Sequence, residues 1–281
     1  MKVIVTGSAG KIGRAAMTAL RKAGHTVVGL DLLATPDRRT VACDCIDFGA
    51  VMGALSGIDA IGGVPDAVIH LAGIPAPGLA TDQHIFAVNT QSSYNIFSAC
   101  ARLGIRRIAW ASSETILGLP FATPPAFVPL DETHPDRPSW SYALAKQLGE
   151  TMADSFVAWH PDMTIASLRF SNVYAAGDYA NLKEIQAKPQ GRRFNLWGYV
   201  DSEDAGEACR LAIEAPFVGH EKMIIAAADT IVDRPSAELM RENFPDVPLK
   251  TAIEGQASLL STARAKQLIG YEPRFSWRNR I

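Results

Sequence analysis

VIVTGSAGKIG, at residues 3–13, decides the fold of this chain. Its first three residues have the apolar character of a buried strand, and the glycine-rich turn that follows opens a segment of helical spacing. A strand, a glycine turn and a helix in this order are typical of dinucleotide binding. Gly7 permits the tight turn, Gly10 lets the backbone approach a pyrophosphate, and Gly13 allows close packing of helix on strand. The stretch predicts the first βαβ unit of a cofactor-binding sheet.

Apolar runs of strand length alternate with helical segments from the N-terminus to about Tyr174. Strands are expected at residues 3–5, 26–30, 67–71, 107–111 and 164–169. The alternation predicts an α/β fold with a Rossmann-type, doubly wound parallel sheet. It weakens beyond Tyr174, so we predict a dinucleotide-binding domain with the catalytic residues over 1–175. Residues 176–281 are then mainly a smaller, substrate-binding lobe that can return segments to the sheet.

Six prolines between Gly118 and Pro138 exclude regular structure from that stretch. We expect an irregular loop there that forms a wall of the substrate pocket. Later in the chain, we expect helices at 202–214 and 258–269, a helix opening at Pro235, and a strand at 223–227.

The composition is that of an ordinary globular protein. Of the 281 residues, 48% are apolar and 20% are charged, which excludes a disordered chain. Lys and Arg number 27 against 29 Asp and Glu, with no blocks of like charge, so neither nucleic acid nor a membrane is an expected partner. The N-terminal apolar run is too short for a signal segment or a membrane span, and a cytoplasmic location is expected.

The four cysteines show none of the paired C-x-x-C spacing of zinc sites, and no metal is expected. Cys43 and Cys45 could form a metal or redox pair. We favour simple packing for both, because small apolar side chains two residues apart in a strand face the same side.

Asp31 lies at the end of the second expected strand, downstream of Gly13 in the same βαβ unit. A carboxylate there can accept hydrogen bonds from the ribose hydroxyls of adenosine, which favours NAD. It would repel the 2′-phosphate of NADP, although Arg38 and Arg39 could partly offset this, so NADP is the less favoured cofactor. Asp44 is a candidate adenine contact or, equally, a surface turn residue.

Tyr142 and Lys146 stand four residues apart at the start of an expected helix and therefore share one face of it. A phenol, with an ordinary pKa of about 10, needs nearby positive charge to work as an acid/base near neutral pH. Lys146 and an oxidised nicotinamide would supply that charge. Ser112 and Ser113 close a strand at the sheet edge where ligands of open α/β sheets bind, so a hydroxyl there can bind a substrate oxygen.

His70 and Glu114 are two further titratable residues at this sheet edge. We favour a hydrogen-bonded, partly buried histidine over a general base at His70. Glu114 follows Ser113 and is either a second acid/base or a loop carboxylate, and both alternatives stay open.

Taken in order, these motifs resemble those of the extended short-chain dehydrogenases/reductases, also called the NAD-dependent epimerase/dehydratase family. The resemblance rests on TGSAGKIG (6–13), Asp31, HLAG (70–73), Ser112-Ser113, YALAK (142–146) and LRFSNVY (168–174). It covers residues 1 to about 175 and continues less specifically through Tyr199-Val200-Asp201. In size the chain is similar to the uronate-dehydrogenase-like members.

The resemblance implies that Tyr142 is the acid/base, that Lys146 holds the nicotinamide ribose and lowers the Tyr142 pKa, and that Ser113 orients the reacting oxygen. It also places Asn89 and Phe170 near the cofactor and Asn172 near the substrate. The predicted cofactor contacts are Gly7, Gly10, Lys11, Ile12, Gly13, Asp31, Asp44, Cys45, Leu71, Ala72, Gly73, Asn89, Tyr142, Lys146 and Phe170. The predicted substrate contacts are Ser112, Ser113, Glu114 and Asn172.

Two departures bear on the substrate. Leu117 stands where many nucleotide-sugar relatives have Tyr, and Ser113-Glu114-Thr115 differs from the Thr-Asp-Glu run of dehydratases. We therefore expect an NAD-dependent oxidoreductase that moves hydride between nicotinamide and a secondary alcohol of a sugar or sugar acid. The alternatives are a nucleotide-sugar 4-epimerase and, less favoured, a non-catalytic NAD-binding regulator. A homodimer is expected through the helices at 89–103 and 142–159.

Overall fold

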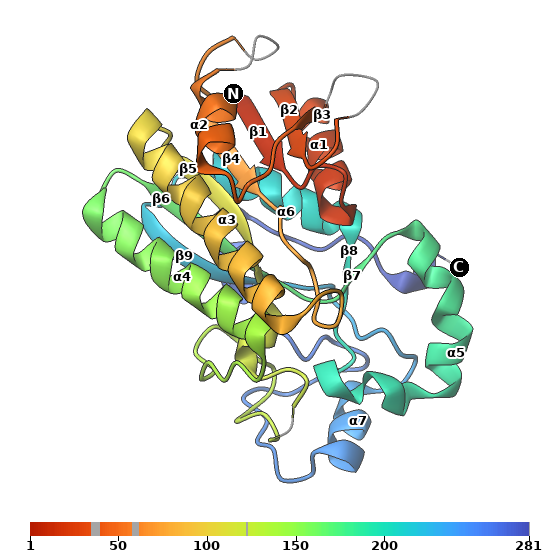
Figure 1. Ribbon diagram of the computed structural model, residues 1–281. Coiled ribbons are helices and arrows are strands. Elements are labelled where there is room, and N and C mark those ends of the chain that lie inside the picture. Colours follow the sequence, from red (N-terminus) through yellow and green to blue (C-terminus); the bar gives the residue numbers. More distant parts are fainter. Residues whose placement is uncertain (35–39, 58–61, 122, 281) are drawn as a thin grey trace.

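A seven-stranded parallel sheet forms the centre of the protein (Figure 1). The computed structural model describes residues 1–34, 40–57, 62–121 and 123–280. The strands lie in the order β3-β2-β1-β4-β5-β6-β9. Their bounds are β1 Lys2–Thr6, β2 Thr26–Asp31, β3 Thr40–Ala42, β4 Ala67–His70, β5 Arg107–Ser113, β6 Thr164–Phe170 and β9 Gly219–Ile225. This arrangement confirms the predicted α/β class and the parallel, Rossmann-type sheet.

Helices cover both faces of the sheet, because successive strand residues point to opposite sides. Val3 and Val5 of β1 belong to a core with one group of helices, and Ile4 belongs to a core with the other group. The first group is α1 Lys11–Lys22, α6 Ser202–Glu214 and α8 Ala263–Ile269. The second is α2 Phe48–Ser56, α3 Asp82–Leu103 and α4 Ser141–Trp159. In Figure 1, α3 and α4 lie side by side in front of the sheet.

A third core fills a lobe beyond the carboxyl edge of the sheet. The lobe elements are β7 Val173–Tyr174, η2 Ala176–Asn181, α5 Leu182–Ala187, η3 Pro189–Asn195, β8 Val200–Asp201, α7 Ser236–Asn243 and η4 Trp277–Asn279. Leu117 of η1 (Glu114–Leu117) is buried in the same core, together with Leu119, Val128 and Leu130. The chain therefore crosses between the sheet and the lobe more than once.

The five strands expected before Tyr174 are all present, with only small differences at their ends. The helix expected at 258–269 is wrong at its start, because α8 begins only at Ala263. The preceding backbone pairs instead with Leu130, whose N–H donates to the Leu259 carbonyl at 2.8 Å. The strand expected at 223–227 is β9, which begins earlier, at Gly219.

All four cysteines are buried free thiols. Cys43 and Cys45 pack in the core with α2 and α3, as predicted, although both follow β3 rather than lying in a strand. Among the described residues, no group of three or more His, Cys, Asp or Glu side chains could hold a metal ion. No helix of that same part of the chain is long and apolar enough to cross a bilayer.

Candidate active site

The glycine turn between β1 and α1 has the shape of a cradle. Gly7 has a φ of +66°, and a Cβ on Gly13 would lie 2.1 Å from the Gly7 carbonyl oxygen. Gly10 is the N-cap of α1, and no side chain caps that helix end. The first N–H groups of the helix thus remain directed at the space above the turn, where the helix dipole favours an anion. These features fit a dinucleotide pyrophosphate.

Asp31 ends β2 beside this turn and is half-buried. Its carboxylate accepts hydrogen bonds from the Ala9 N–H at 2.9 Å and the Leu32 N–H at 2.8 Å. These bonds fix the carboxylate at the rim of the cradle, where the sequence analysis placed a ribose contact. Arg38 and Arg39 lie outside the described residues.

Replacing Asp31 with Ala should weaken NAD binding at least about tenfold, because hydrogen bonds to a charged group contribute roughly 1.5–3 kcal/mol. The preference for NAD over NADP should narrow at the same time, since the repulsion of the 2′-phosphate is lost. Titration of wild type and variant with both cofactors measures this. Tighter binding of NADP than of NAD by the wild type would show that Asp31 does not set the preference.

Other predicted cofactor contacts have partners of their own. Lys11 forms an ion pair with Asp178 of η2 at 2.6 Å, which links the glycine turn to the lobe. Asp44 is exposed and accepts from the Ile46 N–H at 3.0 Å, the geometry of a turn aspartate. Cys45 is buried. The structure brings Lys11 to the cradle but gives Asp44 a local turn role, and Asp44 as an adenine contact stays a prediction.

Ser113, Tyr142 and Lys146 meet at the carboxyl end of β5. All three are buried, and the Ser113 hydroxyl is hydrogen-bonded to the Tyr142 phenol. The Lys146 Nζ donates to the Ala111 carbonyl at 2.7 Å and lies 5.7 Å from the centre of the Tyr142 ring. The spacing of four residues on α4 thus places phenol and ammonium in one site.

Burial sets the charge of both α4 side chains. It raises the pKa of Tyr142 to about 12, with the Ser113 hydrogen bond opposing and the Glu114 charge adding to the rise. It lowers the pKa of Lys146 to about 8. The phenol is therefore neutral and Lys146 mostly charged at neutral pH. We expected the protein to lower the pKa of Tyr142, but in the structure this pKa is raised. The reason is that desolvation of the phenolate outweighs the hydrogen bond from Ser113.

Ser112 points away from this trio, since neighbouring strand residues face opposite sides. Its hydroxyl donates to Glu150 Oε1 at 2.6 Å, and this placement argues against the predicted substrate contact of Ser112. Glu150 also pairs with Arg169, at 2.8 Å from Nε and 2.7 Å from Nη2. Both charged side chains are 1% exposed. The sequence analysis missed this pair, although a charged residue inside the apolar strand at 164–169 was a signal for it.

His70 is fully enclosed. Its Nδ1 lies 2.8 Å from the Thr6 hydroxyl, and burial lowers its pKa to about 3, so it is neutral. This fits the hydrogen-bonded histidine that the sequence analysis favoured, although the burial is deeper than expected. The Thr6 oxygen also accepts from the N–H groups of Leu71 and Ala72, both at 3.1 Å. The backbone after β4 is thereby held against the glycine turn.

Asn89 of α3 holds the loop after β4 in place through two hydrogen bonds. Its side chain accepts from the Ile74 N–H at 2.8 Å and donates to the Ile74 carbonyl at 3.1 Å. A Cβ on Gly73 would lie 2.8 Å from the Asn89 Oδ1, so only glycine fits there. Asn89 therefore acts on the predicted cofactor contacts at 71–73 by positioning their backbone.

The substrate side of the site lies between β6 and the lobe. Phe170 is buried in the core at the end of β6, and Asn172 is exposed. Asn172 lines a cavity of about 530 Å³. The remaining lining residues are Lys11, Val173, Tyr174, Asp178, Asn181, Glu184, Ile185, Lys188, Gly191 and Arg192. Three of these are basic and two are acidic, with Lys11 and Asp178 paired to each other, so the lining suits a polar ligand.

Glu114 is buried directly beside the trio, with 6% of its surface exposed. Burial raises its pKa to about 7, against the opposing effects of the Ser171 hydroxyl, the Arg192 charge and the Asn195 amide. Of the two alternatives left open by the sequence, a loop carboxylate does not describe Glu114, because it is buried and begins η1; a role as second acid/base stays a prediction. Nothing in the sequence indicated that Asn195 and Arg192 lie here.

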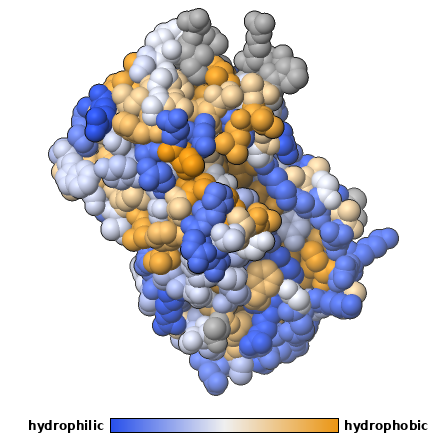
Figure 2. All heavy atoms as spheres, viewed as in Figure 1, coloured by the Kyte–Doolittle hydropathy of each residue, from blue (hydrophilic) through white to orange (hydrophobic). Residues whose placement is uncertain are grey.

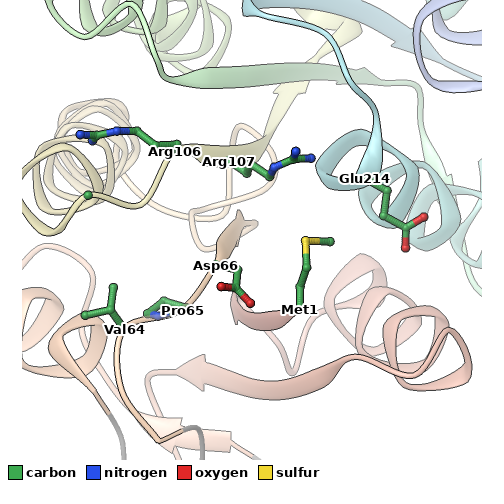
Figure 3. Close-up of a pocket in the computed structure, with 8 residues that line it drawn as sticks. Met1, Val64, Pro65, Asp66, Arg106, Arg107 and Glu214 are labelled. Atoms are coloured by element: carbon green, nitrogen blue, oxygen red, sulfur yellow. The ribbon is translucent and has the colours of Figure 1, made fainter.

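A larger hollow, of about 810 Å³, lies at the opposite edge of the sheet. Figure 3 shows Met1, Asp66, Arg107 and Glu214 around it, at the amino ends of strands and the end of α6. Ligands of open α/β sheets bind at the carboxyl ends of the strands. The smaller cavity, which Lys11 and Asn172 line, is therefore the better candidate for part of the substrate site, although Ser113, Tyr142 and Lys146 do not line it.

Comparison with known families decides the assignment. The NAD dependent epimerase/dehydratase family matches residues 3–227, from β1 to the end of β9. The chain belongs to this family. Membership confirms the resemblance seen in the sequence and, because the family is NAD dependent, the predicted cofactor.

The relatives of this chain include both epimerases and dehydrogenases. A UDP-glucose 4-epimerase of Neisseria meningitidis serogroup C is 29% identical over 75% of this chain and 64% of its own. The chain thus spans slightly less than two thirds of that relative. A uronate dehydrogenase of Pseudomonas syringae pv. tomato is 26% identical over 78% and 72%. An L-arabinose 1-dehydrogenase (NAD(P)(+)) of Haloferax volcanii is 24% identical over 97% and 96%.

A solved structure shares the fold over the whole chain. It is a short-chain dehydrogenase/reductase superfamily protein from Agrobacterium tumefaciens with bound NAD, with a TM-score of 0.72 and 24% identity. The match covers 100% of this chain and 94% of the other. The sheet and the small C-terminal lobe therefore have the same fold as that structure.

Proposed function

We propose that this family member is an NAD-dependent dehydrogenase that oxidises a secondary alcohol of a sugar or sugar acid. The observation that carries the proposal is the meeting of Ser113, Tyr142 and Lys146 at the carboxyl end of β5, on the same edge of the parallel sheet as the glycine turn after β1. The uronate and L-arabinose dehydrogenases among the relatives support a small carbohydrate as the substrate.

Each residue has one task in this mechanism. Bound NAD would supply the acceptor for the hydride that leaves the alcohol carbon. The positive charges of Lys146 and of a bound oxidised nicotinamide would together favour the phenolate of Tyr142. In that form Tyr142 takes the proton of the substrate hydroxyl on its phenolic oxygen, and the Ser113 hydroxyl donates a hydrogen bond to the same substrate oxygen. Lys146, held by the Ala111 carbonyl, keeps a positive charge beside the phenol and favours its ionised form. The glycine turn would hold the pyrophosphate of the cofactor, and Asp31 would hold the ribose of its adenosine.

A 4-epimerase is the second candidate, supported by the similarity to the Neisseria enzyme. Lys188, Arg192 and Lys11 line the cavity and could face the phosphates of a nucleotide sugar. An epimerase uses the same trio but must retain the reduced cofactor until the keto intermediate is reduced again. A dehydrogenase must release it.

The experiment that separates the two uses purified protein, added NAD, and a set of free sugars, sugar acids and nucleotide sugars. We expect protein that is largely free of NAD after purification and stoichiometric NADH formation, followed by absorbance, with a free sugar or sugar acid. Tightly bound NAD, interconversion of two nucleotide sugars and no NADH accumulation would support the epimerase instead.

We also propose a homodimer formed through α3 and α4. Large apolar side chains are exposed on both helices, namely Tyr94, Leu144, Leu148 and Trp159. Figure 2 shows apolar residues among polar ones on the face where these helices lie. Light scattering should give a dimer for the wild type and a monomer for Leu148→Glu, because a buried charge without a partner opposes association. Val218→Glu, at an exposed site before β9, should stay dimeric. A monomeric wild type would contradict the proposal.

A further inference from the structure

We propose that Glu114, Asn195 and Arg192 form a subsite that binds two neighbouring hydroxyl groups of the substrate, next to the reacting carbon. The inference rests on the proposed function, because it names the substrate group that the same site recognises. Such a subsite would make polyhydroxylated substrates bind more tightly than simple secondary alcohols.

The three residues come together from the sheet and the lobe. Glu114 follows Ser113 at the end of β5, and Asn195 ends η3 of the lobe. The Asn195 Nδ2 lies 3.4 Å from the Glu114 Oε1. Asn195 and Arg192 both donate to the Gly198 carbonyl, at 2.9 Å and 3.1 Å, which places their side chains next to each other. The cluster therefore joins the catalytic strand end to the cavity that Arg192 lines.

Each residue of the cluster has a buried polar atom that lacks a partner. Within the described parts of the chain, the Glu114 Oε2, the Asn195 Oδ1 and the Arg192 Nε are buried without a hydrogen bond of normal geometry, and so is the Oγ of Ser171, whose hydroxyl lies next to Glu114. Glu114 is 6% exposed and Asn195 is 1% exposed. A buried polar atom without a partner costs about 1–3 kcal/mol, and such atoms are rare in folded proteins. Three in one cluster indicate that a ligand completes their hydrogen bonds.

The donor and acceptor pattern selects the ligand. Two of the free atoms are acceptors, on Glu114 and Asn195, and the third is the N–H donor of Arg192. Two neighbouring hydroxyls can donate to both acceptors while one of their oxygens accepts from the Nε. A carboxylate has no proton for the Glu114 oxygen, and the negative charge of either a carboxylate or a phosphate would be repelled by ionised Glu114. A vicinal diol is the group that meets all three atoms.

The ionisation of Glu114 should make the binding of a diol depend on pH. With its pKa near 7, the side chain is ionised above neutral pH and accepts strong hydrogen bonds from hydroxyls. Below neutral pH it carries a proton and loses one acceptor position. The charged or titratable groups that face it are Arg192, which stays cationic, and Tyr142, whose pKa of about 12 keeps it neutral. Binding of a diol should therefore tighten as the pH rises through 7.

The test measures binding to protein saturated with NADH, so that no alcohol is oxidised. Calorimetric titrations use L-arabinose, D-glucuronate and UDP-glucose, with cyclohexanol as a ligand of one hydroxyl. They are run one pH unit below and above the Glu114 pKa of about 7. The proteins are the wild type, Glu114→Gln, Asn195→Ala and, as a matched control on the lobe helix α7, Glu238→Gln.

We expect at least one of the three carbohydrates to bind the wild type more tightly than cyclohexanol does. At the higher pH, Glu114→Gln should bind it about tenfold more weakly, because the hydrogen bonds to a charged group are gone, and it should keep only the pH dependence that Lys146 causes. Asn195→Ala should also bind more weakly, and Glu238→Gln should match the wild type. Since Lys146 titrates in every variant, only the difference between wild type and Glu114→Gln reports on Glu114.

Three results would overturn the subsite. They are binding by Glu114→Gln that equals the wild type at both pH values, binding of cyclohexanol as tight as that of the carbohydrates, or no binding by any of the three carbohydrates. Failure of the proposed function would look different. The carbohydrates would then still bind in a way that depends on Glu114, but no NADH would form when NAD is added. The dehydrogenase would survive without the subsite if NADH forms equally well in the Glu114→Gln variant.

Discussion

Tyr142→Phe turns over its substrate about 100-fold more slowly than the wild type, or slower still, which is the usual effect of losing a positioned acid/base. The substitution removes one oxygen from a side chain that is 8% exposed and leaves its ring packing intact. Ser113 keeps its contact with the Thr115 hydroxyl at 2.9 Å, so its position should not change. Steady-state NADH formation with the substrate found in the sugar screen provides the measurement.

Two controls isolate the chemistry in that experiment. The variant should bind NAD and unfold at a denaturant midpoint close to that of the wild type, because the aromatic ring and its packing are kept and only the phenolic oxygen is removed. Turnover near that of the wild type would remove Tyr142 from the mechanism and leave Glu114 as the remaining buried acid next to Ser113.

Glu150→Ala should destabilise the protein by about 3 kcal/mol, since it leaves the buried Arg169 guanidinium without its main partner. Asp136 remains at 3.0 Å from the Arg169 Nη2, but this carboxylate is partly exposed and cannot replace both bonds. The Ser112 hydroxyl also loses its acceptor. Urea unfolding measures the change in free energy.

Glu272→Ala is the matched control for Glu150→Ala. Its carboxylate pairs with Lys266 at 2.7 Å, but both side chains are exposed, so the pair is screened by water. Little change in the unfolding midpoint is expected for that variant. A Glu150→Ala protein as stable as this control would show that the Arg169 charge is solvated or otherwise paired.

The parts of the site that could be predicted from the sequence are those whose residues are close along the chain. The glycine turn joins a strand directly to a helix, and Tyr142 and Lys146 are one helical turn apart, so local geometry alone places them together. The end of β2 likewise follows from the apolar run before Asp31. Strand alternation could also have separated Ser112 from Ser113, but the two were predicted to share one site.

The parts that could not be predicted depend on contacts between distant segments. Asn195 contacts Glu114 although the two are 81 residues apart in the sequence, and no sequence motif at either residue predicts this contact. The late start of α8 has the same origin, because the backbone before it pairs with Leu130 rather than forming helix. The charges of Tyr142 and Lys146 depend on burial, which spacing along a helix does not reveal.

The shared core of the lobe limits how the enzyme can be re-engineered. Leu119, Val128 and Leu130 come from the segment between the catalytic strand and α4, yet they pack among side chains from the C-terminal part of the chain. Val128 and Leu130 also pair through the backbone with Leu249 and Leu260. A chimera that exchanges only the C-terminal residues with those of a relative would join two unmatched halves of one core. Transfer of substrate specificity between family members therefore requires exchanging residues 117–130 together with the lobe.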